Sequence, residues 1–145
     1  MMRQLGPPPP PTNAAVSRSM RGNAPKNTGP EMELRRLLWA AGHRGYRLHW
    51  KKAPGRPDIS FPGRKVAVFV NGCFWHRCPR CQPPAPRSHS EFWRRKFELN
   101  RERDLRKQRE LERSGWQVLT VWECELRSDP TDVVSRVASA LGQQG

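Results

Sequence analysis

One aspartate stands where a metal-binding carboxylate would be expected. Asp58 closes the string Pro54-Gly-Arg-Pro-Asp58, next to a turn and at the start of a predicted strand. Mg²⁺ prefers one or two carboxylates together with water and substrate phosphate oxygens. A turn aspartate that accepts backbone hydrogen bonds is the structural alternative. The sequence leaves both interpretations of Asp58 open.

An aromatic string with one histidine follows the most apolar run of the chain. It reads Asn71-Gly-Cys-Phe-Trp-His76, and it is predicted to be irregular. His76 could act as a general acid or base near neutral pH. Phe74 and Trp75 cannot both point inward from an extended backbone, so we expect at least one of them to face solvent or a ligand.

Cysteines could form a metal site. Cys78-Pro-Arg-Cys81 is a CxxC knuckle, a common half-site for zinc, and Cys124 is a candidate third ligand. The fourth ligand could be Cys73, His76 or Asp104, and spacing does not decide among them. Reduced core thiols and a CxxC redox pair are the alternatives, although the βαβ context of a redox site is missing.

The apolar pattern predicts the elements that would position these residues. Capping boxes at Thr28-Gly-Pro-Glu31 and Ser88-His-Ser-Glu91 predict helix starts, the second helix running to about Arg113. Asp129-Pro130 predicts the start of a last short helix. Strands are predicted over 46–50, 58–61, 65–70 and 116–122, and 71–87 is predicted to be irregular. The order α-β-β-β-α-β-α predicts an α/β fold with a mixed sheet flanked by helices.

Composition narrows the function further. The chain has 145 residues, a formal net charge of +14 and six Trp. Such a basic chain is unsuited to a neutral metabolite and indicates a nucleic-acid partner. Residues 1–27 are Pro-rich and free of acidic residues, so we expect a disordered basic arm followed by one domain over 28–145. No apolar run suits a membrane span or a secretory signal, which predicts a cytoplasmic protein.

Several ordered strings resemble the very short patch repair endonuclease family, whose members nick DNA beside a T·G mismatch left by deamination of 5-methylcytosine. The resemblance covers about residues 18–127. It is carried by Ser19-Met20-Arg21, Thr28 to Leu38, Pro54-Gly-Arg-Pro-Asp58, Gly72-Cys-Phe-Trp-His76, Glu91-Phe-Trp93, Asn100-Arg-Glu-Arg-Asp104 and Gly115-Trp through Trp122-Glu-Cys124.

The resemblance implies a restriction-endonuclease-like fold and Mg²⁺-dependent hydrolysis of one DNA strand, 5′ of the mismatched T. It implies that Asp58 and the backbone carbonyl of Val70 bind Mg²⁺. It implies that His76 is the general base or positions the water, and that Glu31 is a further active-site carboxylate. Glu31 also has a complete structural explanation as the third residue of a capping box. Some relatives have His where this chain has Asn71, so His76 must carry the base role.

The resemblance also implies a structural Zn²⁺ and a set of DNA contacts. The zinc ligands would be Cys78, Cys81, Asp104 and Cys124, with Cys73 left to packing. Aromatic residues would enter from the major groove and the arm from the minor groove, where a wedge favours weak base pairs. These DNA-binding residues are Phe74, Trp75 and Trp93 on the major-groove side, and Met20 with Arg21 on the arm.

Duplex DNA with a T·G mismatch is the expected partner of a bacterial, nucleoid-associated monomer. Mismatch-repair proteins and a cytosine methyltransferase system are further candidate partners. Two alternatives remain: a restriction or mobile-element nuclease of the same fold, and a non-catalytic zinc-stabilised DNA-binding module. Asp58 and His76 favour the enzymes, since DNA binding alone requires neither.

Overall fold

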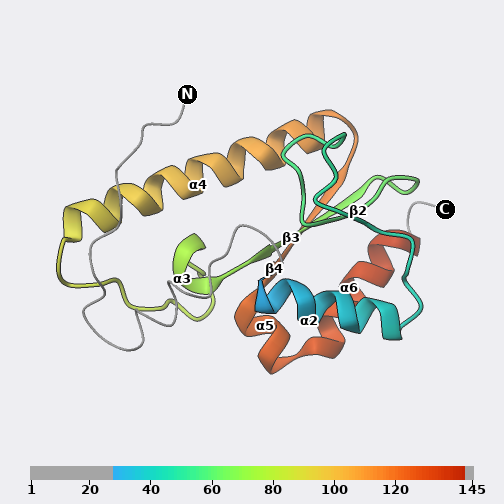
Figure 1. The fold of residues 1–145 in the computed structure, drawn as a ribbon, viewed down its shortest axis with the longest axis horizontal. Helices are drawn as coiled ribbons and strands as arrows, with labels where there is room; N and C mark the ends of the chain where they lie inside the picture. The colour runs from blue at the N-terminus through green and yellow to red at the C-terminus, as the bar shows by residue number, and fades with distance from the viewer. Residues whose placement is uncertain (1–27, 143–145) are drawn as a thin grey trace.

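A four-stranded sheet between helices forms the centre of the protein. A computed structural model describes residues 28–142, and Met20 and Arg21 lie outside that range. Figure 1 shows the elements in chain order: α2 (Gly29–Ala40), β1 (Arg47–Leu48), β2 (Ile59–Phe61), β3 (Val66–Asn71), α3 (Cys73–His76), α4 (Ser90–Arg113), β4 (Gln117–Trp122), α5 (Glu123–Ser128) and α6 (Pro130–Gly142).

The sheet has the order β1-β2-β3-β4. β1 pairs antiparallel with β2, and β2 pairs antiparallel with β3. β3 and β4 are parallel, with Val66 opposite Gln117 and Asn71 opposite Trp122. The long helix α4 makes the crossover between them. The predicted mixed sheet flanked by helices is confirmed.

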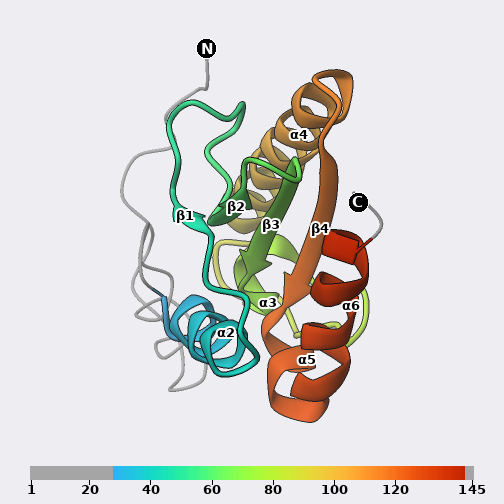
Figure 2. The same cartoon turned by 90° about the vertical axis from the view of Figure 1, so that its right-hand side faces the viewer.

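Alternation along β3 divides the core between two faces of the sheet. Val66, Val68 and Val70 pack with the apolar side chains of α2, α5 and α6. Ala67 and Phe69 point to the other face, where Leu111 of α4 covers them. Figure 2 shows β3 and β4 between these two helical layers. Because both faces are buried, this strand can be continuously apolar.

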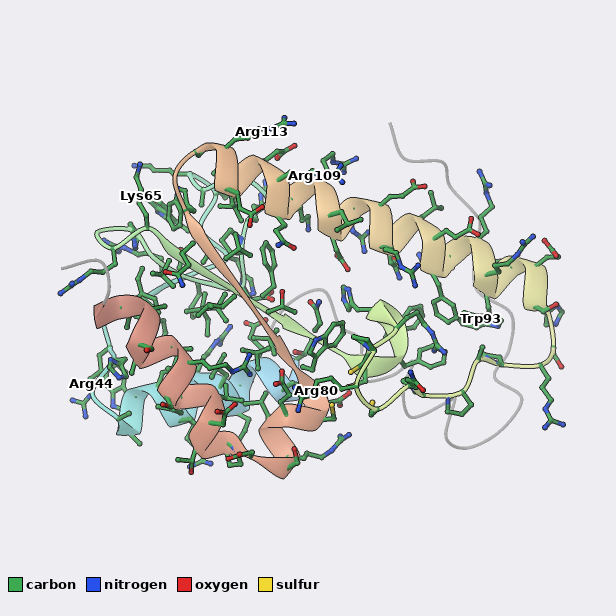
Figure 3. The ribbon with its side chains drawn as sticks, turned by 180° about the vertical axis from the view of Figure 1, so that it is seen from behind. Arg44, Lys65, Arg80, Trp93, Arg109 and Arg113 are labelled. Carbon is green, nitrogen blue, oxygen red and sulfur yellow. The ribbon has the colours of Figure 1, made fainter. Side chains whose placement is uncertain are left out.

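The first half of α4 extends past the sheet and packs on α3 instead (Figure 1). Buried aromatic rings fill the space between the two helices. Trp93 points from α4 toward α3 (Figure 3). The element that closes one face of the core therefore also supports the segment after β3.

Three local predictions are corrected. The segment after β3 is not wholly irregular, because Cys73–His76 forms the short helix α3. The second capping box does not form: His89 occupies the N-cap position in a left-handed conformation and makes no side-chain cap bond. The chain after β4 turns at once into α5, which begins at Glu123 and was not predicted.

Within residues 28–142, no helix combines the length and apolar character that crossing a membrane requires.

Candidate active site

Asp58 directly precedes β2, where the antiparallel neighbour β3 brings Val70 beside it. The Val70 backbone N–H donates to Asp58 Oδ2 at 2.7 Å. Burial raises the pKa of Asp58 from 3.8 to about 6 despite this hydrogen bond, and the negative charge of Glu31 adds to the increase. The carboxylate therefore accepts a backbone hydrogen bond, as the structural alternative predicted. It also has too little positive charge nearby to offset the effect of burial on its pKa.

His49 joins Asp58 to Glu31 and was missed by sequence reasoning. Its Nε2 lies 3.0 Å from Glu31 Oε2 and 3.8 Å from Asp58 Oδ1. Ligand atoms of the three residues all lie within 4.8 Å of one another. The signal was strand register: Leu48 pairs with Ile59 in an antiparallel ladder, so His49, the residue after Leu48, stands opposite Asp58, the residue before Ile59.

Glu31 illustrates how a cap position and a site position can coincide. Its backbone N–H donates to Thr28 Oγ1 at 3.3 Å, which is one half of the predicted capping box and makes Thr28 the N-cap of α2. Its carboxylate turns into the site, where it contacts His49 and forms an ion pair with Arg35. Glu31 is only 2% exposed, so these partners offset the cost of burying its charge.

A cavity of about 760 Å³ opens beside Asp58 and gathers most of the predicted site residues. Glu31, Val70 and His76 line it, and Asn71 stands between the last two in the chain. Its basic lining residues are Arg56, Lys96, Arg103, Lys107 and Arg127. A lining that combines acidic and basic groups suits a phosphodiester held beside a metal-binding carboxylate.

His76 ends α3 and pairs with Asp104 of α4. Its Nδ1 lies 2.6 Å from Asp104 Oδ2. A carboxylate only accepts, so Nδ1 carries the proton and Nε2 of the neutral ring keeps its lone pair. Asn100 supports the arrangement from one turn earlier in α4, since its buried amide donates to the Trp75 carbonyl at 3.1 Å.

All four cysteines lie together. The sulfur atoms of Cys73, Cys78, Cys81 and Cys124 all lie within 4.8 Å of one another. The fourth candidate zinc ligand therefore differs from the one that the family resemblance implied. Cys73 belongs to the group, whereas Asp104 is hydrogen-bonded to His76. The reason is helix α3, which turns Cys73 back toward the knuckle; the Cys78 N–H donates to the Cys73 carbonyl at 3.0 Å.

The cysteine group fits a structural zinc ion. Sulfur atoms around tetrahedral zinc, with Zn–S near 2.3 Å, are about 3.8 Å apart. Cys78 Sγ and Cys124 Sγ are 3.8 Å apart, which is too far for a disulfide. Burial raises the pKa of Cys73 and Cys124. Burial also acts to raise the pKa of Cys78, but hydrogen bonds from the backbone N–H groups of Cys81 and Arg80, together with those from the Cys124 and Cys81 thiols, lower that pKa overall. Converging thiols of this kind favour a cation that stabilises their thiolates.

The three predicted wedge aromatics pack against one another. Phe74, Trp75 and Trp93 are 7%, 8% and 2% exposed, with partly buried Phe92 and Phe97 around them. We expected Phe74 or Trp75 to face outward because an extended backbone separates neighbours. The backbone there is helical, so both rings turn to the same side, with centroids 5.3 Å apart. Phe74 and Trp75 still line the cavity, while Trp93 does not.

Known proteins resemble the chain over most of its length. A family model described as DNA mismatch endonuclease Vsr matches residues 11–82. The type II nicking enzyme V.XorIIP of Xanthomonas oryzae pv. oryzae is 48% identical over 116 residues, which cover 80% of this chain and 84% of that protein. The type II nicking enzyme V.NaeI of Lentzea aerocolonigenes is 41% identical over 138 residues, covering 92% and 80%. The DNA mismatch endonuclease Vsr of Escherichia coli is 40% identical over 116 residues, covering 79% and 72%.

Proposed function

The chain belongs to the Vsr DNA mismatch endonuclease family, and we propose that it nicks one strand of duplex DNA 5′ of the T in a T·G mismatch, by Mg²⁺-dependent hydrolysis in very short patch repair. Endonuclease action on DNA follows from the family. Metal-dependent hydrolysis is supported by the Glu31–His49–Asp58 group, whose two carboxylates line the same cavity as the His76–Asp104 pair.

The acidic group suits a divalent cation. The raised pKa of Asp58 has burial and the charge of Glu31 as its causes, and a cation would counter both. Asp58 and the Val70 carbonyl are the proposed Mg²⁺ ligands, with Glu31 acting through the surrounding water. When bound, Mg²⁺ would neutralise the scissile phosphate and make a coordinated water more acidic.

His76 is proposed as the general base. Because Asp104 holds Nδ1, Nε2 can accept a proton from a water molecule in the cavity. Asp104 also stabilises the imidazolium that results. The water oxygen bonds to phosphorus, the bond to the leaving deoxyribose oxygen breaks, and that oxygen takes a proton from solvent. Asn71 cannot act as a base, so the role falls to His76.

Mismatch recognition is proposed for the aromatic wall of the cavity. Phe74 and Trp75 line the cavity, and both rings pack against Trp93. A mismatched step is less costly to unstack than a paired one, so rings pressed against it discriminate in favour of T·G. Met20 and Arg21 remain proposed contacts on the minor-groove side. One catalytic set cuts one strand, so a monomer is sufficient.

The test is to incubate wild type and Asp58→Ala with T·G and T·A duplexes in Mg²⁺. We expect wild type to nick only the T·G duplex and the variant to nick neither. Equal cutting of both duplexes would contradict mismatch specificity and favour a general nuclease. Binding without cutting would favour a DNA-binding module. Metal analysis in parallel should find about one equivalent of zinc in both proteins.

A further inference from the structure

Lys107 of α4 lines the cavity and has no part in the proposed function above. It is half-buried and faces the same space as Asp58 and His76. Within residues 28–142, its ammonium has no hydrogen-bond or ion-pair partner. The nearby carboxylates are already engaged, Asp58 by the Val70 N–H and Asp104 by His76.

The loop that carries Asp58 rests on the stem of this lysine. Gly55 adopts a positive φ of 73°, and a Cβ placed there would lie 2.8 Å from Lys107 Cβ and 3.0 Å from its Cγ. This close approach is possible only because Gly55 lacks a side chain. The Lys107 stem is therefore held against the loop beside Asp58, and its position relative to the carboxylate is set by packing.

A half-buried ammonium without a partner is unfavourable, and this one lies beside a site that receives an anion. Burial lowers the pKa of Lys107, and the neighbouring positive charge of Arg103 lowers it further. Asp104 and Asp58 act in the opposite direction. The lysine carries three donors, and a phosphate oxygen would satisfy at least one of them. Surface lysines that only attract DNA need no such burial.

We propose that Lys107 is a catalytic residue that donates a hydrogen bond to a non-bridging oxygen of the scissile phosphate. The inference depends on the proposed endonuclease site, because the scissile phosphate must enter this cavity. Attack by water increases the negative charge on that oxygen, so the ammonium stabilises the transition state more than the bound substrate. Lys107 gains and loses no proton in this role, and His76 remains the base.

The test compares Lys107→Met with Arg109→Met. Methionine keeps the Cβ and Cγ atoms that pack on Gly55 and removes only the charged end. Arg109 is exposed, lies two residues further along α4 on its outer side (Figure 3), and does not line the cavity. It is therefore a matched loss of one positive charge. Thermal unfolding of each variant verifies that it folds.

We expect Lys107→Met to lower the single-turnover nicking rate on a T·G duplex by about 100-fold or more, as loss of one transition-state donor does. DNA affinity measured without divalent cations should fall less than about five-fold, as for the loss of one phosphate contact. Arg109→Met should affect rate and affinity alike, each by about three-fold or less. Lys107→Arg keeps the charge and should recover at least about ten-fold of the lost rate.

A phosphorothioate at the scissile position adds a readout that a structural role would not move. Sulfur in place of the oxygen that Lys107 contacts should slow wild type, and this loss should shrink in Lys107→Met. Equal rate losses in the Lys107→Met and Arg109→Met variants would overturn the inference and leave the endonuclease function intact. A folded Lys107→Met variant that nicks at the wild-type rate would do the same. A wild type that nicks no duplex would overturn both.

Discussion

Replacing Asp58 by Asn should make the protein more stable near neutral pH when no divalent cation is added. Burial and the charge of Glu31 raise the pKa of Asp58 from 3.8 to about 6. The ionised carboxylate is therefore less favourable in the fold than in the unfolded chain. Asparagine has nearly the same shape, and its Oδ1 can still accept the hydrogen bond from the Val70 N–H. The substitution removes the charge and keeps the contact.

The pKa shift sets the magnitude. A rise of roughly two pKa units corresponds to about 3 kcal/mol of unfolding free energy. Because the pKa is higher in the folded state, the folded protein keeps a proton that the unfolded chain has lost between these values. The stability from this group is complete below about pH 4 and is lost as the pH rises through about 6. Asparagine avoids that loss. The unfolding free energy of Asp58→Asn should therefore exceed that of wild type by about 2–3 kcal/mol at about pH 7.5, and by about half as much at about pH 5.

Urea unfolding of both proteins, followed by tryptophan fluorescence, measures this difference. The buffer should be depleted of Mg²⁺ by resin without a chelator, because a chelator would also remove zinc from the cysteine group. Asp132→Asn, at an exposed position, is the control and should change stability by about 0.5 kcal/mol or less. An Asp58→Asn protein no more stable than wild type at neutral pH would show that the buried charge of Asp58 does not destabilise the fold. A gain in unfolding free energy of equal size at both pH values would contradict the raised pKa of Asp58 as its cause.

Further substitutions test the remaining contacts. Asp104→Asn should lower the nicking rate by about 100-fold or more through loss of the His76 partner, while zinc content stays at about one equivalent. Loss of zinc from this variant would show instead that Asp104 is a zinc ligand. Cys73→Ser should lose most of its zinc in metal analysis, and a fully loaded variant would exclude this sulfur as a ligand. Gly55→Ala should lower the unfolding free energy by about 2 kcal/mol, because φ is positive and the new Cβ meets α4 at 2.8 Å. Gly63→Ala, where nothing lies within 4 Å, should change it by less than about 1 kcal/mol, and equal losses would contradict the packing argument.

Elements with strong local signals were predictable. The apolar run from Val66 to Val70 is a central strand because both faces of that strand are covered. The long charged helix ends at Arg113, and Gly115 follows with a φ of 85°. Short elements were not predictable in this way. α3 and α5 have four and six residues, too few for a helical period to emerge, and packing against the rest of the fold stabilises them.

Patterns of consecutive residues were enough to predict several parts of the site. They placed Asp58 at a strand start, Glu31 in the first turn of a helix and His76 just after the central strand, because caps, turns and strand periods are local patterns. Which of these groups lie in contact depends on how distant segments pack in three dimensions. Strand register places His49 beside Asp58, and the packing of α4 on α3 brings Asp104 within hydrogen-bond distance of His76. The turn of α3 brought Cys73 to the other cysteines, and α4 brought Lys107 beside Asp58. Contacts between distant segments depend on register and helix crossing, which local periodicity does not specify.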